Sequence, residues 1–250
     1  MIILKSRQEI DKMRKSGIIV ANVLEGIRDM IKPGITTLIL DEFAEKLILS
    51  SGARPAFKGY RGYPKTLCTS LNSQVVHGIP SKDVILSEGD IISVDVGAIV
   101  EGFYGDAAAT FPVGKVSLEA QLLVNVTEEA LYKGIAEAKP GNRLYDVSHA
   151  VQSHAESNGY SVVRDFVGHG IGRNMHEDPQ IPNFGERGQG PRLKSGMVLA
   201  IEPMVNIGSS GTVVQEDGWT AVTTDGSLSA HFEHTVALTQ EGPWILTRKQ

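Results

Sequence analysis

The sequence predicts an α+β fold built from two similar halves, roughly residues 1–115 and 116–250. In each half, two segments with helical spacing of apolar residues precede several short β-branched segments. Landmark residues also recur at a single offset of 107 residues. These pairs are Lys32-Pro33-Gly34 with Lys139-Pro140-Gly141, Gly52 with Gly159, Gly89 with Gly196, and Asp95 with Glu202. Such a repeat indicates an internal duplication. Because no segment has the composition of a linker, we expect a single domain over residues 1–250.

The first half is expected to begin with two helices. Ser6 to Met30 reads as the first, because Ser6 and Glu9 form a capping-box pattern at its start. Thr37 to Leu49 reads as the second, and the glycine- and aromatic-rich segment Pro55 to Pro64 reads as a loop. The strands expected in this half are Thr66 to Leu71, Gln74 to His77, Ile91 to Val96 and Ala107 to Val113.

The second half repeats this order of elements. Helices are expected at Leu118 to Ala138 and at Ser148 to Asn158, and Gly185 to Pro191 reads as a flexible polar loop. The strands expected in this half are Tyr160 to Val167, Met197 to Val205, Thr212 to Val214, Thr220 to Thr223 and Ser229 to Leu238.

Two acids lie in an apolar hairpin of the first half. A turn at Glu101-Gly102 would oppose Gly97 to Asp106. Asp95 would then share one face with Asp106 as its diagonal neighbour, roughly 7–8 Å away between Cα atoms. Two buried carboxylates on one face repel each other unless a shared proton, a basic side chain or a metal ion lies between them.

Composition excludes several classes of protein. The net charge of −5 and the absence of a basic run argue against a DNA partner. One cysteine, Cys68, allows no internal disulfide and no Cys-rich zinc site, and it fits a reducing cytosol. No apolar segment approaches the ~20 residues that span a bilayer, and Met1 to Leu4 is too short for the core of a signal peptide. We therefore expect a cytoplasmic protein without a membrane partner.

Seven acids and histidines stand in apolar or glycine-rich surroundings. They are His77, Asp95, Asp106, His169, His176, Glu202 and Glu233. The strands around the four acids contain no Lys or Arg, so a dinuclear divalent-metal site explains these acids best. His169, flanked by glycines, is the expected fifth ligand, and carboxylates with an imidazole suit Mn, Fe, Co or Zn. His149, His154 and His231 read as ordinary helix or surface residues, and His234 has no clear assignment.

These motifs together resemble those of type I methionine aminopeptidases over essentially the whole chain. The segments that carry the resemblance are Asn72 to Pro80, Val94-Asp95-Val96, Gly105-Asp106, Gly168 to Pro179, Ile201 to Met204 and Phe232 to Thr235. The resemblance implies the duplicated "pita-bread" fold, in which helices cover a central antiparallel sheet. It also implies hydrolytic removal of the N-terminal methionine from nascent proteins and peptides, with preference for a small second residue.

The resemblance further implies roles for individual residues. The ligands of two divalent ions, among Co, Mn, Fe, Zn and Ni, would be Asp95, Asp106, His169, Glu202 and Glu233. Asp106 and Glu233 would bridge both ions, and a hydroxide shared by the ions would attack the scissile carbonyl. His77 would contact the substrate amide, His176 the carbonyl oxygen, and Glu202 would shuttle the proton. The substrate-binding residues would be Phe57, Tyr60, Tyr63, Cys68, His77, Met175, His176 and Trp219. A monovalent cation would bind at Asn72, Gln74 and Ser229.

Two pocket residues depart from the family pattern: Phe57 stands where some members have cysteine, and Met175 where many have an aromatic residue. The resemblance also implies a monomer that associates transiently with the ribosome.

Three other readings remain. An Xaa-Pro aminopeptidase or prolidase usually carries a large N-terminal domain, for which the segment before Asp95 leaves no room. A catalytically dead pita-bread binding module would need broken ligands. A purely structural metal protein would leave His77 and His176 without a role.

Overall fold

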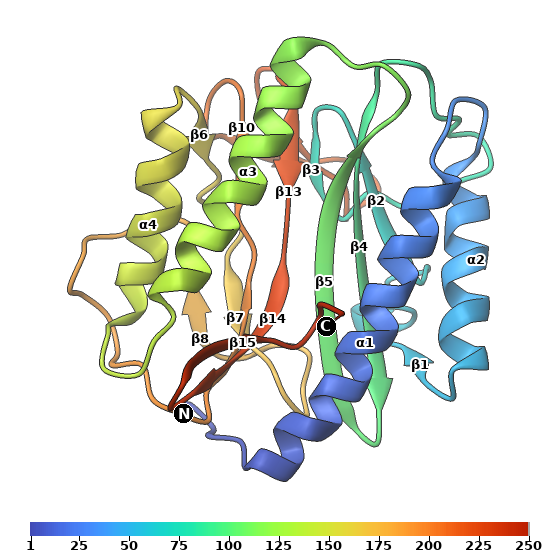
Figure 1. Cartoon of the computed structure of the whole chain (residues 1–250). Coiled ribbons are helices and arrows are strands. Elements are labelled where there is room, and N and C mark those ends of the chain that lie inside the picture. The colour runs from blue at the N-terminus through green and yellow to red at the C-terminus, as the bar shows by residue number, and fades with distance from the viewer. Residues whose placement is uncertain (250) are drawn as a thin grey trace.

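The computed structural model describes residues 1–249 and places its helices in two pairs, α1 with α2 and α3 with α4, beside the two halves of a set of antiparallel strands (Figure 1). The helices are α1 (Arg7–Met30), α2 (Thr37–Ser50), α3 (Leu118–Glu137) and α4 (Leu144–Ser157), with a 3-10 turn at Tyr60–Gly62. The strands of the first half are β1 (Arg54–Pro55), β2 (Leu67–Leu71), β3 (Gln74–Val76), β4 (Ile91–Val100) and β5 (Phe103–Pro112). The strands of the second half are β6 (Ser161–Val162), β7 (Gly168–Gly170), β8 (Glu177–Ile181), β9 (Val198–Ile201), β10 (Met204–Asn206), β11 (Thr212–Val214), β12 (Ala221–Thr223), β13 (Ser229–His231), β14 (His234–Thr239) and β15 (Gly242–Ile245).

Local capping interactions set where the helices begin. The Ser6 hydroxyl accepts the Glu9 N–H while the Glu9 carboxylate accepts the Ser6 N–H, which confirms the predicted capping box of α1. The predicted start of α4 at Ser148 is wrong. The helix begins at Leu144, because the Asp146 carboxylate accepts the Arg143 N–H at 2.7 Å and stabilises an earlier first turn.

The acidic hairpin has the predicted register. Val100 pairs with Phe103 and Gly97 with Asp106 across the Glu101-Gly102 turn, where both residues have positive φ. Asp95 pairs with Ala108, so Asp95 and Asp106 are diagonal neighbours on one face. On the other side of β4, strand β2 places Cys68 opposite Asp95.

Two predicted long strands are each broken at a candidate ligand. The expected strand Met197 to Val205 divides into β9 and β10 around Glu202-Pro203. The expected strand Ser229 to Leu238 divides into β13 and β14 around Phe232-Glu233. The two breaks lie against each other, because the Phe232 N–H donates to the Pro203 carbonyl at 3.2 Å. Proline, which has no N–H, favours such an interruption.

Other strand predictions need smaller corrections. Of the expected strand Tyr160 to Val167, only β6 pairs, because the chain turns at Arg164-Asp165 and the Asp165 carboxylate accepts a bond from the Thr212 hydroxyl. Strands β1, β7, β8 and β15 were not predicted. His169 lies within a short strand, β7, that pairs with β8 and β9.

The two halves repeat each other in detail. Helices α2 and α4 have the same length and are offset by 107 residues, as are the short strands β1 and β6. Isolated bridges at Thr36–Ile85 and Arg143–Arg192 show the same offset. The matched glycines also share positive φ, for example 90° at Gly34 and 99° at Gly141. Each half has its own apolar core, one beneath α1 and α2 and the other beneath α3 and α4. The duplicated α+β fold is therefore confirmed.

A second set of equivalent residues meets between the halves. Ala108 and Glu233 exchange two backbone hydrogen bonds, at 3.4 and 2.8 Å. The Thr235 hydroxyl contacts both the N–H and the carbonyl of Asp106, and the Thr110 hydroxyl contacts the N–H and the carbonyl of His231 in the same way. Asp106 and His231 thus occupy equivalent positions about the pseudo-two-fold axis.

Within residues 1–249, no helix is both long enough and apolar enough to cross a membrane.

The hydroxyl of Thr235 can be tested by an isosteric change. Thr235→Val leaves two buried backbone groups of Asp106 without a partner, so we expect the free energy of unfolding to fall by about 2–4 kcal/mol. Urea unfolding measures the loss. Thr69→Val is the matched control, because the Thr69 hydroxyl is buried without a partner among the described residues. Equal stability of the two variants would show that the Thr235 contacts contribute nothing.

Candidate metal centre and substrate cavity

Five side chains from neighbouring strands converge on one cavity of about 160 Å³. Asp95 comes from β4, Asp106 from β5 and His169 from β7, while Glu202 and Glu233 come from the two strand breaks. The structure therefore brings together all five predicted ligands. Because each break bends the backbone out of the ladder, it can present a carboxylate at the end of a strand rather than on a sheet face.

Distances within this cluster suit a metal centre. One ligand atom from each of Asp106, His169 and Glu233 lies within 4.8 Å of the others. The Nε2 atom of His169 is 3.5 Å from Oε1 of Glu202 and 3.9 Å from Oδ2 of Asp106. The Nδ1 atom of His169 lies 2.9 Å from the Gly170 carbonyl, so Nδ1 carries the proton and Nε2 is left as a ligand atom.

The acids cannot all be ionised here without a cation. Burial raises the pKa of Asp95 to about 7 and that of Glu202 to about 8. Burial and the neighbouring carboxylates hold the pKa of Asp106 and that of Glu233 well above their usual range. Oδ1 of Asp95, Oδ1 of Asp106 and Oε1 of Glu233 are buried without hydrogen-bond partners among the described residues. This donor set of oxygens and one imidazole fits a divalent metal.

The predicted substrate-binding residues line the same cavity. They are Phe57, Tyr60, Tyr63, Cys68, His77, Met175, His176 and Trp219. The Tyr63 hydroxyl donates to the carbonyls of Leu67 and Gly78, and its ring meets Trp219 edge-on at 5.0 Å. Burial raises the pKa of the Cys68 thiol, so this side chain is a neutral apolar part of the wall.

The two predicted catalytic histidines lie next to the acid cluster. The Tyr60 hydroxyl is 2.9 Å from Nδ1 of His176, and the His176 ring is 4.3 Å from the His169 ring. His77 has a φ of 64° and packs edge-on against Phe166. Burial, with a smaller effect from His231, lowers the pKa of His77 to about 4, so its imidazole is neutral.

The predicted monovalent-cation residues also lie near one another. The Ser229 N–H donates to the Asn72 carbonyl at 2.8 Å, and the Gln74 amide oxygen accepts the Leu71 N–H. The Asn72 amide oxygen accepts the Ile91 N–H. Since both side-chain amide oxygens are engaged in protein hydrogen bonds, the backbone carbonyls and the buried Ser229 hydroxyl are the better candidate donors.

His231 is not the surface residue that the sequence suggested. Its side chain is buried, and Nε2 lies 3.6 Å from Oε2 of Glu202 without a hydrogen bond to any described residue. The carboxylate of Glu202 therefore lies between His169 and His231. Strand alternation could have shown this, because His231 is two residues before Glu233.

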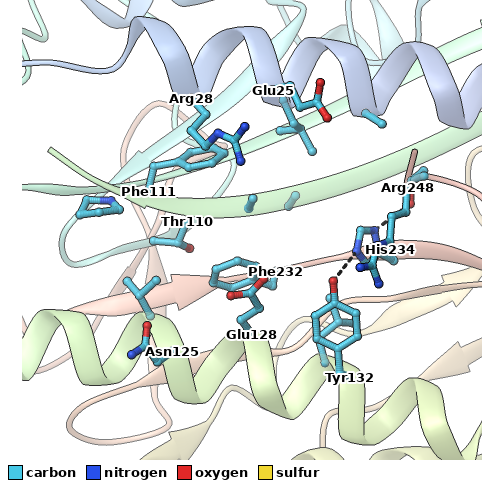
Figure 2. Close-up of a pocket in the computed structure, with 18 of the residues that line it drawn as sticks. Glu25, Arg28, Thr110, Phe111, Asn125, Glu128, Tyr132, Phe232, His234 and Arg248 are labelled. Atoms are coloured by element: carbon cyan, nitrogen blue, oxygen red, sulfur yellow. Dashed lines mark hydrogen bonds between the residues drawn. The ribbon is translucent and has the colours of Figure 1, made fainter. Parts of the chain in front are cut away.

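His234, by contrast, points away from the acid cluster. Figure 2 shows it beside Tyr132, in a groove of about 410 Å³ lined by residues of α1, α3 and β5. Nε2 of His234 is 3.4 Å from the Tyr132 hydroxyl, and Nδ1 is 2.9 Å from the Thr247 hydroxyl. Glu233 and His234, which are consecutive in the chain, thus point to opposite sides.

Comparison with known proteins identifies the family. The sequence model of metallopeptidase family M24 matches residues 11–240. The chain belongs to metallopeptidase family M24. Family M24 membership and the buried Asp–His–Glu cluster together indicate that the protein binds a divalent metal.

Relatives within family M24 are similar over their full length. A methionine aminopeptidase of Clostridium acetobutylicum is 55% identical over 247 residues, covering 99% of each chain. Methionine aminopeptidase 1 of Bacillus subtilis is 54% identical, covering 99% of this chain and all of the relative. These comparisons confirm the resemblance to methionine aminopeptidases.

Solved structures agree with this assignment. The crystal structure of a methionine aminopeptidase from Thermotoga maritima superposes with a TM-score of 0.98, at 52% identity and complete coverage of both chains. A prolidase from Pyrococcus furiosus has a TM-score of 0.79 at 24% identity, covering 99% of this chain and 66% of the prolidase. The prolidase shows only that the fold is shared.

The raised carboxyl pKa values predict how the stability of the metal-free M24 chain varies with pH. Carboxyls in the unfolded chain titrate near pH 4, whereas Asp95 and Glu202 titrate at about 7 and about 8 when folded. The folded state therefore binds more protons between about pH 4 and 8, and its free energy of unfolding falls as pH rises through this range. Urea unfolding in chelator at pH 5 and pH 8 should show the loss, and saturating divalent metal should diminish it. An equal pH dependence with and without metal would contradict the expectation.

Proposed function

We propose that the protein removes the N-terminal methionine from peptides and nascent proteins by metal-dependent hydrolysis. The observation that carries this proposal is one cavity that combines the acid–histidine cluster with a largely apolar pocket. Full-length relatives named methionine aminopeptidase support it. An unbranched thioether side chain suits a pocket walled by Phe57, Tyr63, Cys68 and Met175.

Asp95, Asp106, His169, Glu202 and Glu233 would hold two divalent ions, Asp106 and Glu233 contacting both. When bound, such ions act as Lewis acids and lower the pKa of water to about 7. Four carboxylates supply enough negative charge for two divalent ions, whereas one ion would leave the cluster negatively charged. Glu202 would move the proton between the attacking water and the leaving amine.

The two histidines would act on the peptide itself. With Nδ1 of His176 held by the Tyr60 hydroxyl, Nε2 is left to donate to the scissile carbonyl oxygen. One such donor to a developing oxyanion typically contributes ~3–4 kcal/mol. His77, neutral and buried against Phe166 and Trp219, would contact the substrate amide. A small second residue would fit best beside these side chains.

The remaining features are proposed on the same basis. The whole chain would act as a single catalytic domain, monomeric and cytoplasmic, with transient ribosome association. Asn72, Gln74 and Ser229 would bind a monovalent cation.

Peptide assays test the function directly. We expect cleavage of Met-Ala-Ser, much slower cleavage of Met-Leu-Ser, no cleavage of Ala-Pro peptides, and loss of all activity in chelator. Cleavage of Ala-Pro alone would favour a prolidase-type enzyme. No cleavage of any peptide by metal-loaded protein would favour a binding or structural role.

Asp106→Ala tests the metal centre. It removes one of the acids placed to contact both ions, so metal content and turnover should fall to background while the far-UV circular dichroism and cooperative unfolding are retained. Asp83→Ala, at an exposed acid that pairs with the neighbouring Lys82, is the matched control and should behave as wild type. Normal turnover of Asp106→Ala in a metal-replete assay would end the dinuclear proposal.

A further inference from the structure

A buried ion pair lies behind the loop that carries His176. Nζ of Lys5 is 2.6 Å from Oε2 of Glu177, and the two side chains are only 4% and 5% exposed. Lys5 belongs to the segment before α1, whereas Glu177 immediately follows His176 at the start of β8. The pair therefore connects two parts of the chain that are distant in sequence.

The Glu177 carboxylate also binds the backbone of the loop that precedes it. Its Oε1 accepts the N–H groups of Arg173 at 2.9 Å and Asn174 at 3.2 Å. A Cβ built on Gly172 would lie 2.5 Å from Cε of Lys5 and 2.7 Å from Oε1 of Glu177. The loop is thus packed so closely onto the ion pair that a side chain at position 172 would displace Lys5 and Glu177.

Lys5 is itself held in place. Its N–H donates to the Gly196 carbonyl at 2.7 Å, and its Nζ donates to the Ile3 carbonyl at 3.1 Å. Gly196 directly precedes the segment that leads into β9 and Glu202. The ion pair is therefore anchored to the segment that leads into β9 and the metal centre. Through Glu177, it fixes the loop from Gly172 to His176 relative to that segment.

Stability alone does not explain this arrangement. Burying two charges costs about as much as their attraction returns, and an apolar pair of similar volume often serves as well. A carboxylate that accepts three hydrogen bonds does fix the geometry of what it binds. The loop fixed here carries Met175 and His176, both of which line the catalytic cavity.

We infer that Lys5 and Glu177 are positioning residues for the aminopeptidase reaction, acting through the loop that holds His176 and Met175. This inference rests on the proposed function for its kinetic consequences. It predicts that the segment before α1 contributes to catalysis although none of its side chains lines the cavity. Misplacing His176 by ~1 Å would lower the rate by up to ~100-fold.

The first test is amide hydrogen exchange, which needs no substrate. In Glu177→Gln and Lys5→Met, the Arg173 and Asn174 amides should exchange at least about tenfold faster than in wild type, because their acceptor is weakened or released. Lys12→Met is the matched control, since Lys12 pairs with Glu101 at the surface at 3.4 Å. Unchanged exchange in both variants would overturn the inference.

The second test is a double-mutant cycle with Met-Ala-Ser as substrate. Lys5→Met should lower kcat ~10- to 100-fold with unchanged metal content and a smaller change in KM. Adding Lys5→Met to His176→Ala should cause little further loss, because the pair acts through His176. Additive losses would show a general structural effect and overturn the inference.

If wild type failed to cleave the peptide, the proposed function would be wrong, while hydrogen exchange would still decide whether the ion pair holds the loop. Should Glu177→Gln not fold, Lys5→Met alone decides, because it removes the cation that holds the Glu177 carboxylate in place without altering Glu177 itself.

Discussion

Repulsion among four carboxylates in one cavity is the constraint that governs how the strands are arranged. Asp95, Asp106, Glu202 and Glu233 meet in one cavity where burial opposes ionisation, so the cluster is stable only with protons or cations between the acids. Holding them there takes strands from both halves and two interruptions of the sheet. The hydrogen bonds of Thr235 to Asp106, and of Ala108 to Glu233, hold the interruption at Glu233 against β5.

Much of this arrangement could be predicted because the information is local. Strand alternation and a two-residue turn are enough to put Asp95 and Asp106 on one face. The 107-residue repeat can also be recognised without knowledge of any contact, because glycines and a proline recur at matched positions of the sequence. The same repeat also locates the start of α4. Adding 107 residues to Thr37, where α2 begins, gives Leu144, where α4 begins, whereas the predicted start at Ser148 is four residues too late.

The features that escaped prediction depend on partners far away in sequence. The apolar residues around Glu202 predict one continuous strand, and so do those around Phe232. Each segment is in fact two strands, and the contact between the two breaks becomes visible only in the structure. In the sequence, Lys5 is simply a charged residue before the first helix, and its partner Glu177 lies 172 residues away. His231 looked unremarkable because its neighbours in the cavity come from β4 and from the end of β9.

The equivalence of Asp106 and His231 bears on the history of such a chain. If the two halves descend from one ancestral unit that paired as a symmetric dimer, these two positions, which the axis relates, once held the same residue. Two carboxylates there would have repelled each other, and two imidazoles would have supplied no negative charge. After fusion into a single polypeptide, the two equivalent positions no longer have to hold the same residue. Each half can then drift separately, and one site can combine an acid from one half with a base from the other, which no identical pair of subunits could offer at those positions.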